Sequence, residues 1–454
     1  MELDPVLLAR IQFAANISFH ILFPTITIGL SWVLLYFRIR YTRSLSSGAG
    51  DDPQWEEAYQ FWVRIFALSF ALGVVSGVTM SFQFGTNWPG FMDRAGNIAG
   101  PLLGYEVLTA FFLEASFLGI MLFGKHRVSN RIHLLATTLV AVGTLLSAFW
   151  ILALNAWMQT PAGFTLENAQ FQVDSWAQVL FNPSFPYRFV HTLIASLLTT
   201  AFLITGVSAF RYRRGLARSM NGRVLRSGIV MAALLSPLQI LVGDLHGLNT
   251  LEYQPAKVAA IEAVWKTERG APFTLLGIPD SDAGRTRMAI RIPNAASLIL
   301  THDWDGEVRG LNEFIGEHPP VAPVFWAFRI MLGVGVLMVT VSWWACWTVF
   351  RRRSYPPLLL KILSLMTYCG WIAVLAGWYV SEIGRQPWMV YGQLKTATLV
   401  ASQTGSVMSI TLLAYLLLYG FLLVSYFSVL RYLASRDSEA SGSQQQAAMK
   451  PGVG

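Results

Sequence analysis

The stretch YEVLTAFFLEASFLGIMLF, residues 105–123, decides the fold class of this chain. It is long and apolar enough to cross a bilayer, yet it contains two carboxylates, Glu106 and Glu114. About 20 apolar residues span the hydrocarbon core of a membrane. A charge at mid-membrane costs a few kcal/mol or more, so such residues usually face the interior of a helix bundle and act there. The stretch therefore predicts a transmembrane helix with a chemical role.

The bulk composition extends this prediction to the whole chain. Of the 454 residues, 54% are hydrophobic and 13% are charged, whereas a soluble domain has roughly 25% charged residues. We predict an all-α polytopic membrane bundle of about nine transmembrane helices. The expected spans are 8–37, 58–84, 101–123, 132–157, 188–210, 224–245, 322–350, 357–380 and 405–433.

The net charge of +8 is explained by topology rather than by binding of nucleic acid. The basic residues gather in the short loops after spans one, three, five and seven, and the alternate short loops nearly lack them. The positive-inside rule then predicts an N-terminus outside the membrane and a C-terminus in the cytoplasm. We expect one transmembrane helical domain, 1–433, with a long outer loop, 246–321, and a disordered cytoplasmic tail, 434–454.

Span one contains His20, and Arg10 lies ten residues earlier near the outer surface. The imidazole is either a hydrogen-bonded structural group or a haem ligand, and the other intramembrane ligand types favour the haem. Glu106 and Glu114 are eight residues apart, which is about 12 Å of rise and roughly 80° of rotation in an α-helix. Such a carboxylate ladder suits proton delivery, and Ser147 in the next span extends it.

His191 begins span five and Met331 begins span seven, at matching depth near the outer face. Neutral histidine and methionine are a known ligand pair for low-spin haem iron. Arg329, two residues before the methionine, could neutralise a haem propionate. Core packing is the alternative interpretation of a lone methionine, and the hypothesis rests on the combination.

Span eight ends in a polar and aromatic cluster. Trp378 and Glu382 share a helix face, and Arg385 follows within a turn. In the long loop, Lys257 and Glu262 lie in YQPAKVAAIEAVWKTE, a pattern typical of a short amphipathic helix. From spacing alone, a solvated charge pair on a surface helix is the expected arrangement of these two.

These residues resemble those of subunit I of cytochrome bd-type quinol oxidases along nearly the whole chain. The matching stretches are ARIQFA and FH in span one, GYEVLTAFFLEASFLGI in span three, RFVHT in span five, GDLHG and KVAAIEAVW in the long loop, FRIM in span seven and GW with EIGRQPW after span eight. The short segment between Lys257 and Met331 resembles the short-loop branch, which includes the cyanide-insensitive oxidases. Whether the third haem is d or a further b stays open.

The resemblance implies a role for each candidate residue. His191 and Met331 would ligate a low-spin haem b, with Arg329 beside it. His20 and Glu382 would serve a high-spin haem b and a haem d, in an order left open. Glu106 would lie beside the pair of high-spin haems. Glu114 and Ser147 would belong to a proton route, and Lys257 and Glu262 to the quinol-oxidising loop. Trp378 and Arg385 would flank the haems.

The resemblance also implies the reaction and the partners. The expected activity is electrogenic oxidation of ubiquinol or menaquinol by O2 without proton pumping. The expected partners are a haem-free subunit II and a small single-span accessory subunit. Two other classes remain: a proton-coupled transporter with Glu106 and Glu114 as its ion site, and a haem-bearing electron carrier without oxygen chemistry.

Overall fold

The computed structural model describes residues 4–46, 52–125, 127–352, 354–399 and 405–436. Within these residues, nine helical segments are long and apolar enough to cross a membrane. This confirms the predicted all-α membrane bundle. The expected spans lie within these segments, because the length of an apolar run can be measured directly in the sequence.

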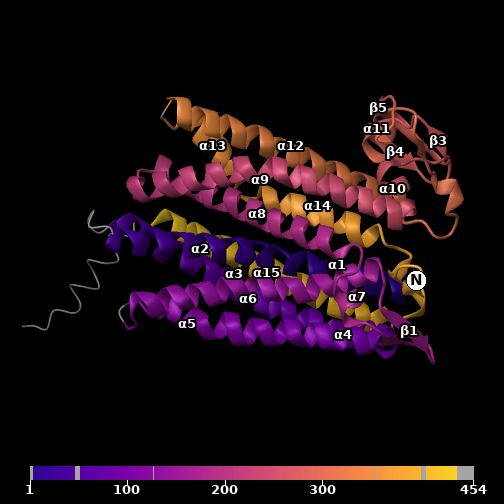
Figure 1. Ribbon diagram of the computed structural model, residues 1–454, viewed down its shortest axis with the longest axis horizontal. Helices are drawn as coiled ribbons and strands as arrows, with labels where there is room; N and C mark the ends of the chain where they lie inside the picture. Colours follow the sequence, from indigo (N-terminus) through magenta and orange to yellow (C-terminus); the bar gives the residue numbers. More distant parts are fainter. Residues whose placement is uncertain (1–3, 47–51, 126, 353, 400–404, 437–454) are drawn as a thin grey trace, which may run out of the picture.

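The long helices run back and forth along the bundle, and several spans consist of two joined helices (Figure 1). They are α1 (Pro5–His20), α2 (Leu22–Ser46), α3 (Pro53–Thr86), α4 (Pro89–Thr109), α5 (Ser116–Phe123), α6 (Asn130–Gln159), α8 (Phe185–Arg213), α9 (Arg218–Tyr253), α12 (Val321–Arg352), α13 (Pro357–Leu365), α14 (Cys369–Ile383) and α15 (Gly405–Ser435).

The connections between the long helices contain short helices and two-stranded antiparallel sheets. The short helices are α7 (Trp176–Leu180), α10 (Pro255–Glu262) and α11 (Ala295–Thr301). The paired strands are β1 (Phe164–Glu167) with β2 (Gln170–Val173), β3 (Glu268–Arg269) with β6 (Glu307–Val308), β4 (Phe273–Asp280) with β5 (Arg285–Ile292), and β7 (Trp388–Val390) with β8 (Leu394–Lys395).

The two ends of the bundle differ in character. The N-terminus, α10 and the paired strands lie at one end, here called the strand end (Figure 1). The basic residues in the last turns of α2, α8 and α12, and Lys125 after α5, lie at the other, here called the arginine end. This segregation is the pattern on which the predicted orientation in the membrane rests.

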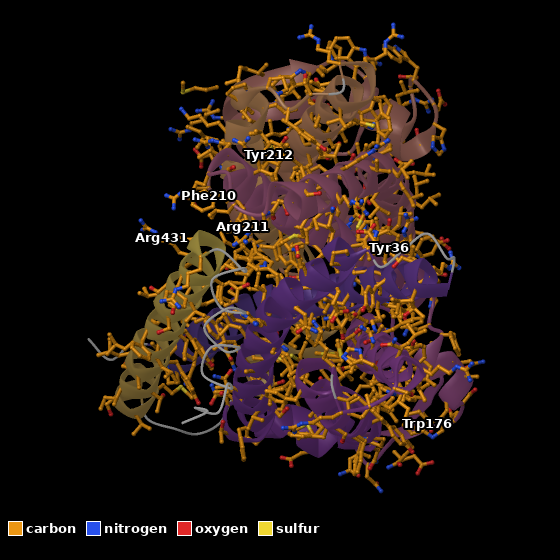
Figure 2. The ribbon with its side chains drawn as sticks, turned by 90° about the vertical axis from the view of Figure 1, so that its left-hand side faces the viewer. Tyr36, Trp176, Phe210, Arg211, Tyr212 and Arg431 are labelled. Carbon is orange, nitrogen blue, oxygen red and sulfur yellow. The ribbon has the colours of Figure 1, made fainter. Side chains whose placement is uncertain are left out.

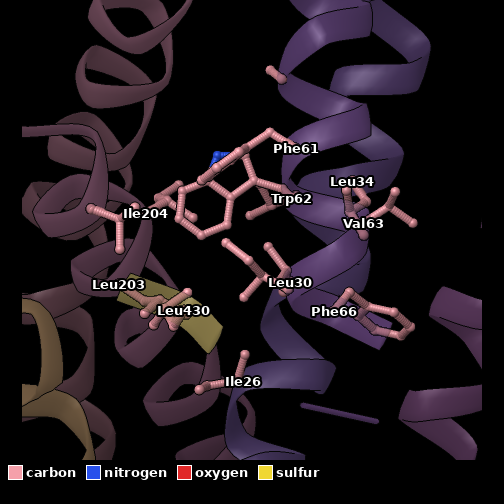
Figure 3. Close-up of a cluster of buried hydrophobic side chains, with 14 of the residues drawn as sticks. Ile26, Leu30, Leu34, Phe61, Trp62, Val63, Phe66, Leu203, Ile204 and Leu430 are labelled. Carbon is pink, nitrogen blue, oxygen red and sulfur yellow. The ribbon is translucent and has the colours of Figure 1, made fainter. Parts of the chain in front are cut away.

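The largest apolar core lies between α2, α3, α8 and α15 (Figure 3). Leu30 on α2 and Trp62 on α3 are fully buried there, together with Leu203 on α8 and Leu430 on α15. Figure 2 looks onto the arginine end, where α8 and α15 meet beside Arg211 and Arg431. Arg211 donates to the carbonyls of Leu433 and Ala434 and so caps the end of α15.

The structure corrects two sequence expectations. The segment 246–321 is not one long loop, because α9 continues to Tyr253 and the rest forms α10, α11 and paired strands. Residues 434 and 435 of the expected tail belong to α15, and 437–454 lie outside the described residues.

Candidate functional site

A cavity of about 430 Å³ lies between α1, α2, α3, α4, the π-turn that follows α4, and α6. Its lining brings together five of the predicted site residues: His20, Glu106, Glu114, Ser147 and Trp378. The Nδ1 atom of His20 lies 3.0 Å from the hydroxyl of Ser76. Hydrogen bonding at one ring nitrogen fixes the orientation of an imidazole that binds a metal through the other.

A π-turn over Ala110–Ala115 changes how the two carboxylates of the third span are placed. Such a turn holds one residue more than an α-helical turn. Eight residues then make close to two full turns, so the expected angle of about 80° between the two carboxylates around the helix axis falls to about 20°. Glu106 and Glu114 therefore line one cavity, and Ser147 lies at 3.5 Å from Glu106. The periodicity of the sequence does not show the extra residue.

Gly143 on α6 makes room for the π-turn. A Cβ atom added there would lie 2.9 Å from the Cβ of Leu113 and 3.0 Å from the Cγ of Glu114. We predict that Gly143→Ala lowers the free energy of unfolding by about 1–3 kcal/mol, because the packed site cannot absorb the extra methyl group. Gly104→Ala is the control, since a Cβ there meets nothing within 4 Å. Thermal unfolding of the two purified variants in detergent checks this, and equal midpoints would contradict it.

A buried polar network surrounds Glu382 at the strand end. The Glu382 carboxylate accepts from Asn155 at 3.0 Å, Gln159 at 3.1 Å and Arg385 at 2.5 Å. Further members join it through two contacts: Lys257 donates to Gln159 Oε1 at 2.7 Å, and Arg188 donates to Ser381 at 2.7 Å. The network thus holds three basic side chains and one carboxylate, an imbalance that favours a bound anionic group.

Lys257 and Glu262 are not the solvated pair that their spacing suggested. Both are buried, at 2% and 5% exposure, and they face different partners. Burial beside Arg188 lowers the pKa of Lys257 well below its ordinary value. Glu262 forms a 2.9 Å ion pair with Arg329. Burial raises the pKa of Glu262, and Arg329 partly offsets that rise.

Arg329 therefore contacts protein groups rather than standing free, since it also donates to the carbonyl of Thr274 at 2.8 Å. Arg10, at the start of the first span, donates to the side chain of Gln386 at 3.0 Å. Both guanidinium groups thus join a membrane helix to the connections at the strand end.

His191 and Met331 each pack against a glycine. The His191 Cε1 atom lies 3.4 Å from a Cβ built on Gly243, and the Met331 sulfur lies 2.9 Å from one built on Gly377. The Nε2 atom of His191 contacts Gln239 at 2.9 Å, while its buried Nδ1 has no hydrogen-bond partner among the described residues. His246 lies beside it, with ring centroids 5.5 Å apart.

Several buried polar atoms around these groups lack partners in the described structure. They include Nε1 of Trp378, Nε2 of His246, and the Nε atoms of Arg188 and Arg385. Unpaired buried donors are rare in native proteins and require an explanation. Together with the excess of basic groups, these unpaired donors fit a bound anionic group such as the propionates of a porphyrin.

Sequence reasoning missed the polar partners Asn155, Gln159 and Arg188. Asn155 and Gln159 lie four residues apart on α6 and therefore share a helix face, and this spacing is the signal that could have indicated them. Arg188 precedes the FVHT motif inside an apolar helix, so its charge alone marks it as unusual.

Comparisons with known proteins agree over nearly the full length. The model of the family described as cytochrome bd terminal oxidase subunit I matches residues 8–438. The chain is 31% identical to cytochrome bd-II ubiquinol oxidase subunit 1 of Escherichia coli (strain K12), covering 97% of this chain and 98% of that protein. It is 32% identical to cytochrome bd ubiquinol oxidase subunit 1 of Bacillus subtilis (strain 168), covering 94% and 93%. The solved bd oxidase from Geobacillus thermodenitrificans superimposes with a TM-score of 0.86 at 31% identity, over 95% of this chain and 98% of that one.

Proposed function

The chain belongs to the cytochrome bd terminal oxidase subunit I family, and from this membership we propose that it is the haem-bearing subunit of an electrogenic quinol:oxygen oxidoreductase. Quinol is oxidised at the strand end, and O2 is reduced to water inside the bundle. The quinol is ubiquinol or menaquinol.

The side chains that could ligate iron are sufficient in number for three haems. His191 and Met331 would hold a low-spin haem b, and His20 and Glu382 would hold the high-spin haem b and the haem d, or a further b in its place. Bound haems supply one-electron transfer and oxygen chemistry, which no side chain provides. Arg188 and Arg385 offer the positive charge that propionates require, and Trp378 adds an unpaired N–H on the same helix as Glu382.

Glu262 and Lys257 serve the quinol in this proposal. A buried carboxyl with a raised pKa is suited to accept a proton from a quinol hydroxyl near neutral pH. Arg329 orients this carboxylate through the 2.9 Å ion pair. Lys257 lies five residues earlier on the same short helix, α10, and can hydrogen-bond the head group.

We predict that Glu262→Gln lowers quinol oxidation at least about tenfold, because the amide cannot accept the proton. Artificial one-electron donors, which do not need this base, should still support oxygen consumption. Both activities are measured with an oxygen electrode on the purified complex. An equal fall in both would remove Glu262 from the quinol site.

Protons for water formation reach the cavity from the arginine end by way of Glu114, and pass to Glu106 and Ser147. Quinol protons leave at the strand end, so each turnover separates charge without a pump. We place the arginine end in the cytoplasm of a bacterial inner membrane. A haem-free subunit II and a small single-span subunit complete the enzyme.

One observation carries this proposal: His20, Glu106, Glu114, Ser147 and Trp378 line a single intramembrane cavity. The experiment is quinol oxidation by the complex in sealed vesicles, with a dye that reports membrane potential. Oxygen uptake with a rising potential is expected. Oxygen uptake without potential would overturn the electrogenic part, and no quinol-dependent oxygen uptake would overturn the whole proposal.

A further inference from the structure

A polar stripe runs along one face of α6 from the arginine end to the cavity. It consists of His133, Thr137, Thr144 and Ser147. At 100° per residue these four fall within about 80° of one another, over about 21 Å of helix. The first three are at most 2% exposed, in a helix that is otherwise largely apolar. Polar side chains inside a membrane bundle are costly and usually mark a pathway.

His133 is the unexplained member of this stripe. It is 1% exposed and interacts with the backbone of Met121, but neither ring nitrogen makes a well-formed hydrogen bond to any described residue. Its ring lies edge-on to Tyr59, with centroids 5.3 Å apart. Bridging water would satisfy such a buried imidazole, because buried donors and acceptors are normally paired.

A buried ion pair connects this region to the arginine end. Arg38 donates to Glu56 and to Asn130, each at 2.8 Å, and both members of the pair are at most 6% exposed. The half-exposed Lys125 reaches the same carboxylate at 3.5 Å. Glu56 offsets the charge of Arg38, so a transient proton on the neighbouring imidazole does not face an uncompensated cation.

Hydroxyl groups continue the route toward the cavity. Tyr59 and Thr137 share a 2.9 Å hydrogen bond, and Thr144 shares one of 3.1 Å with Ser31. Thr144 lines the cavity with Glu114. Glu114 packs at the level of Gly143, six residues from Thr137, which is about 9 Å along the axis. About three hydrogen-bond links of water close that gap.

We propose that His133 is the proton-relay residue through which protons from the arginine end reach Glu114. One ring nitrogen accepts a proton from water beside Glu56 while the other releases one toward Tyr59 and Thr137. The imidazole is neutral before and after each transfer, so the proton count balances. This inference rests on the proposed function, since it supplies the protons that oxygen reduction consumes.

The test uses the complete oxidase complex with His133→Phe, which fills the same space without a proton carrier. The fully reduced enzyme in vesicles is mixed with O2, and the rate of potential development is recorded. We expect that phase and the turnover to slow at least tenfold, with an unchanged reduced-minus-oxidised spectrum. Thr138→Val is the matched control, because Thr138 lies on another face of α6 and bonds only the carbonyl of Leu134.

The possible outcomes separate this inference from the proposed function. A normal spectrum with a normal potential phase in His133→Phe overturns the relay. If that variant does not assemble, Tyr59→Phe and Thr137→Val replace it, and unchanged rates in both overturn the route. If the unaltered complex itself develops no potential, the proposed electrogenic function fails rather than the choice of His133.

Discussion

His191→Ala and Met331→Leu should each abolish the low-spin haem signal and lower quinol oxidase activity by about 100-fold or more. Loss of an outer-shell partner of a metal site alone costs about 10- to 100-fold, and here an iron ligand itself is removed. Leucine preserves the volume of methionine but cannot bind iron. The reduced-minus-oxidised spectrum of the purified complex measures this directly.

Met338→Leu provides the matched control, because Met338 lies on the same helix, α12, and is buried in an apolar cluster. It should leave both the spectrum and the activity unchanged. If Met331→Leu behaves like Met338→Leu, the sulfur serves only packing. A low-spin signal that persists in His191→Ala would contradict ligation by His191 and would indicate His246, the neighbouring ring, as the ligand instead.

Glu114→Ala should slow the proton-consuming steps after O2 binding by about 100-fold, the lower range of what a positioned proton donor contributes. Glu114 is the buried group at which the stripe on α6 meets the cavity. Electron delivery from quinol to the low-spin haem should keep its rate, because that step does not draw on the arginine end.

Stopped-flow spectroscopy separates the two steps of the Glu114→Ala enzyme, and potential development in vesicles reports the proton movement. Normal development of membrane potential by this variant would contradict the route. A parallel slowing of electron delivery would instead indicate general damage to the bundle.

The membrane spans, and several of the side chains that face the interior of the bundle, could be predicted from the sequence for a physical reason. Hydrophobic length and the charge of alternate loops follow from composition, and a carboxylate in an apolar span has few places to lie except the interior. His20, Glu106 and Glu114 were found in this way, and they do line one cavity.

The sequence could not reveal features that depend on packing between distant segments. The π-turn at Ala110–Ala115 leaves no mark in the apolar pattern. Lys257 and Glu262 were predicted to form a surface pair, because a local sequence pattern does not show that other elements cover α10. Arg188 was missed because its hydrogen-bond partner Ser381 comes from a helix far away in the chain.

The central claim is that iron porphyrins occupy the polar interior of this bundle. The most direct measurement is the absorption spectrum of the purified, assembled complex, followed by haem extraction and quantification. We expect low-spin b bands together with high-spin b or far-red d bands, and extractable haem in stoichiometric amount. A correctly assembled complex without bound tetrapyrrole would contradict it.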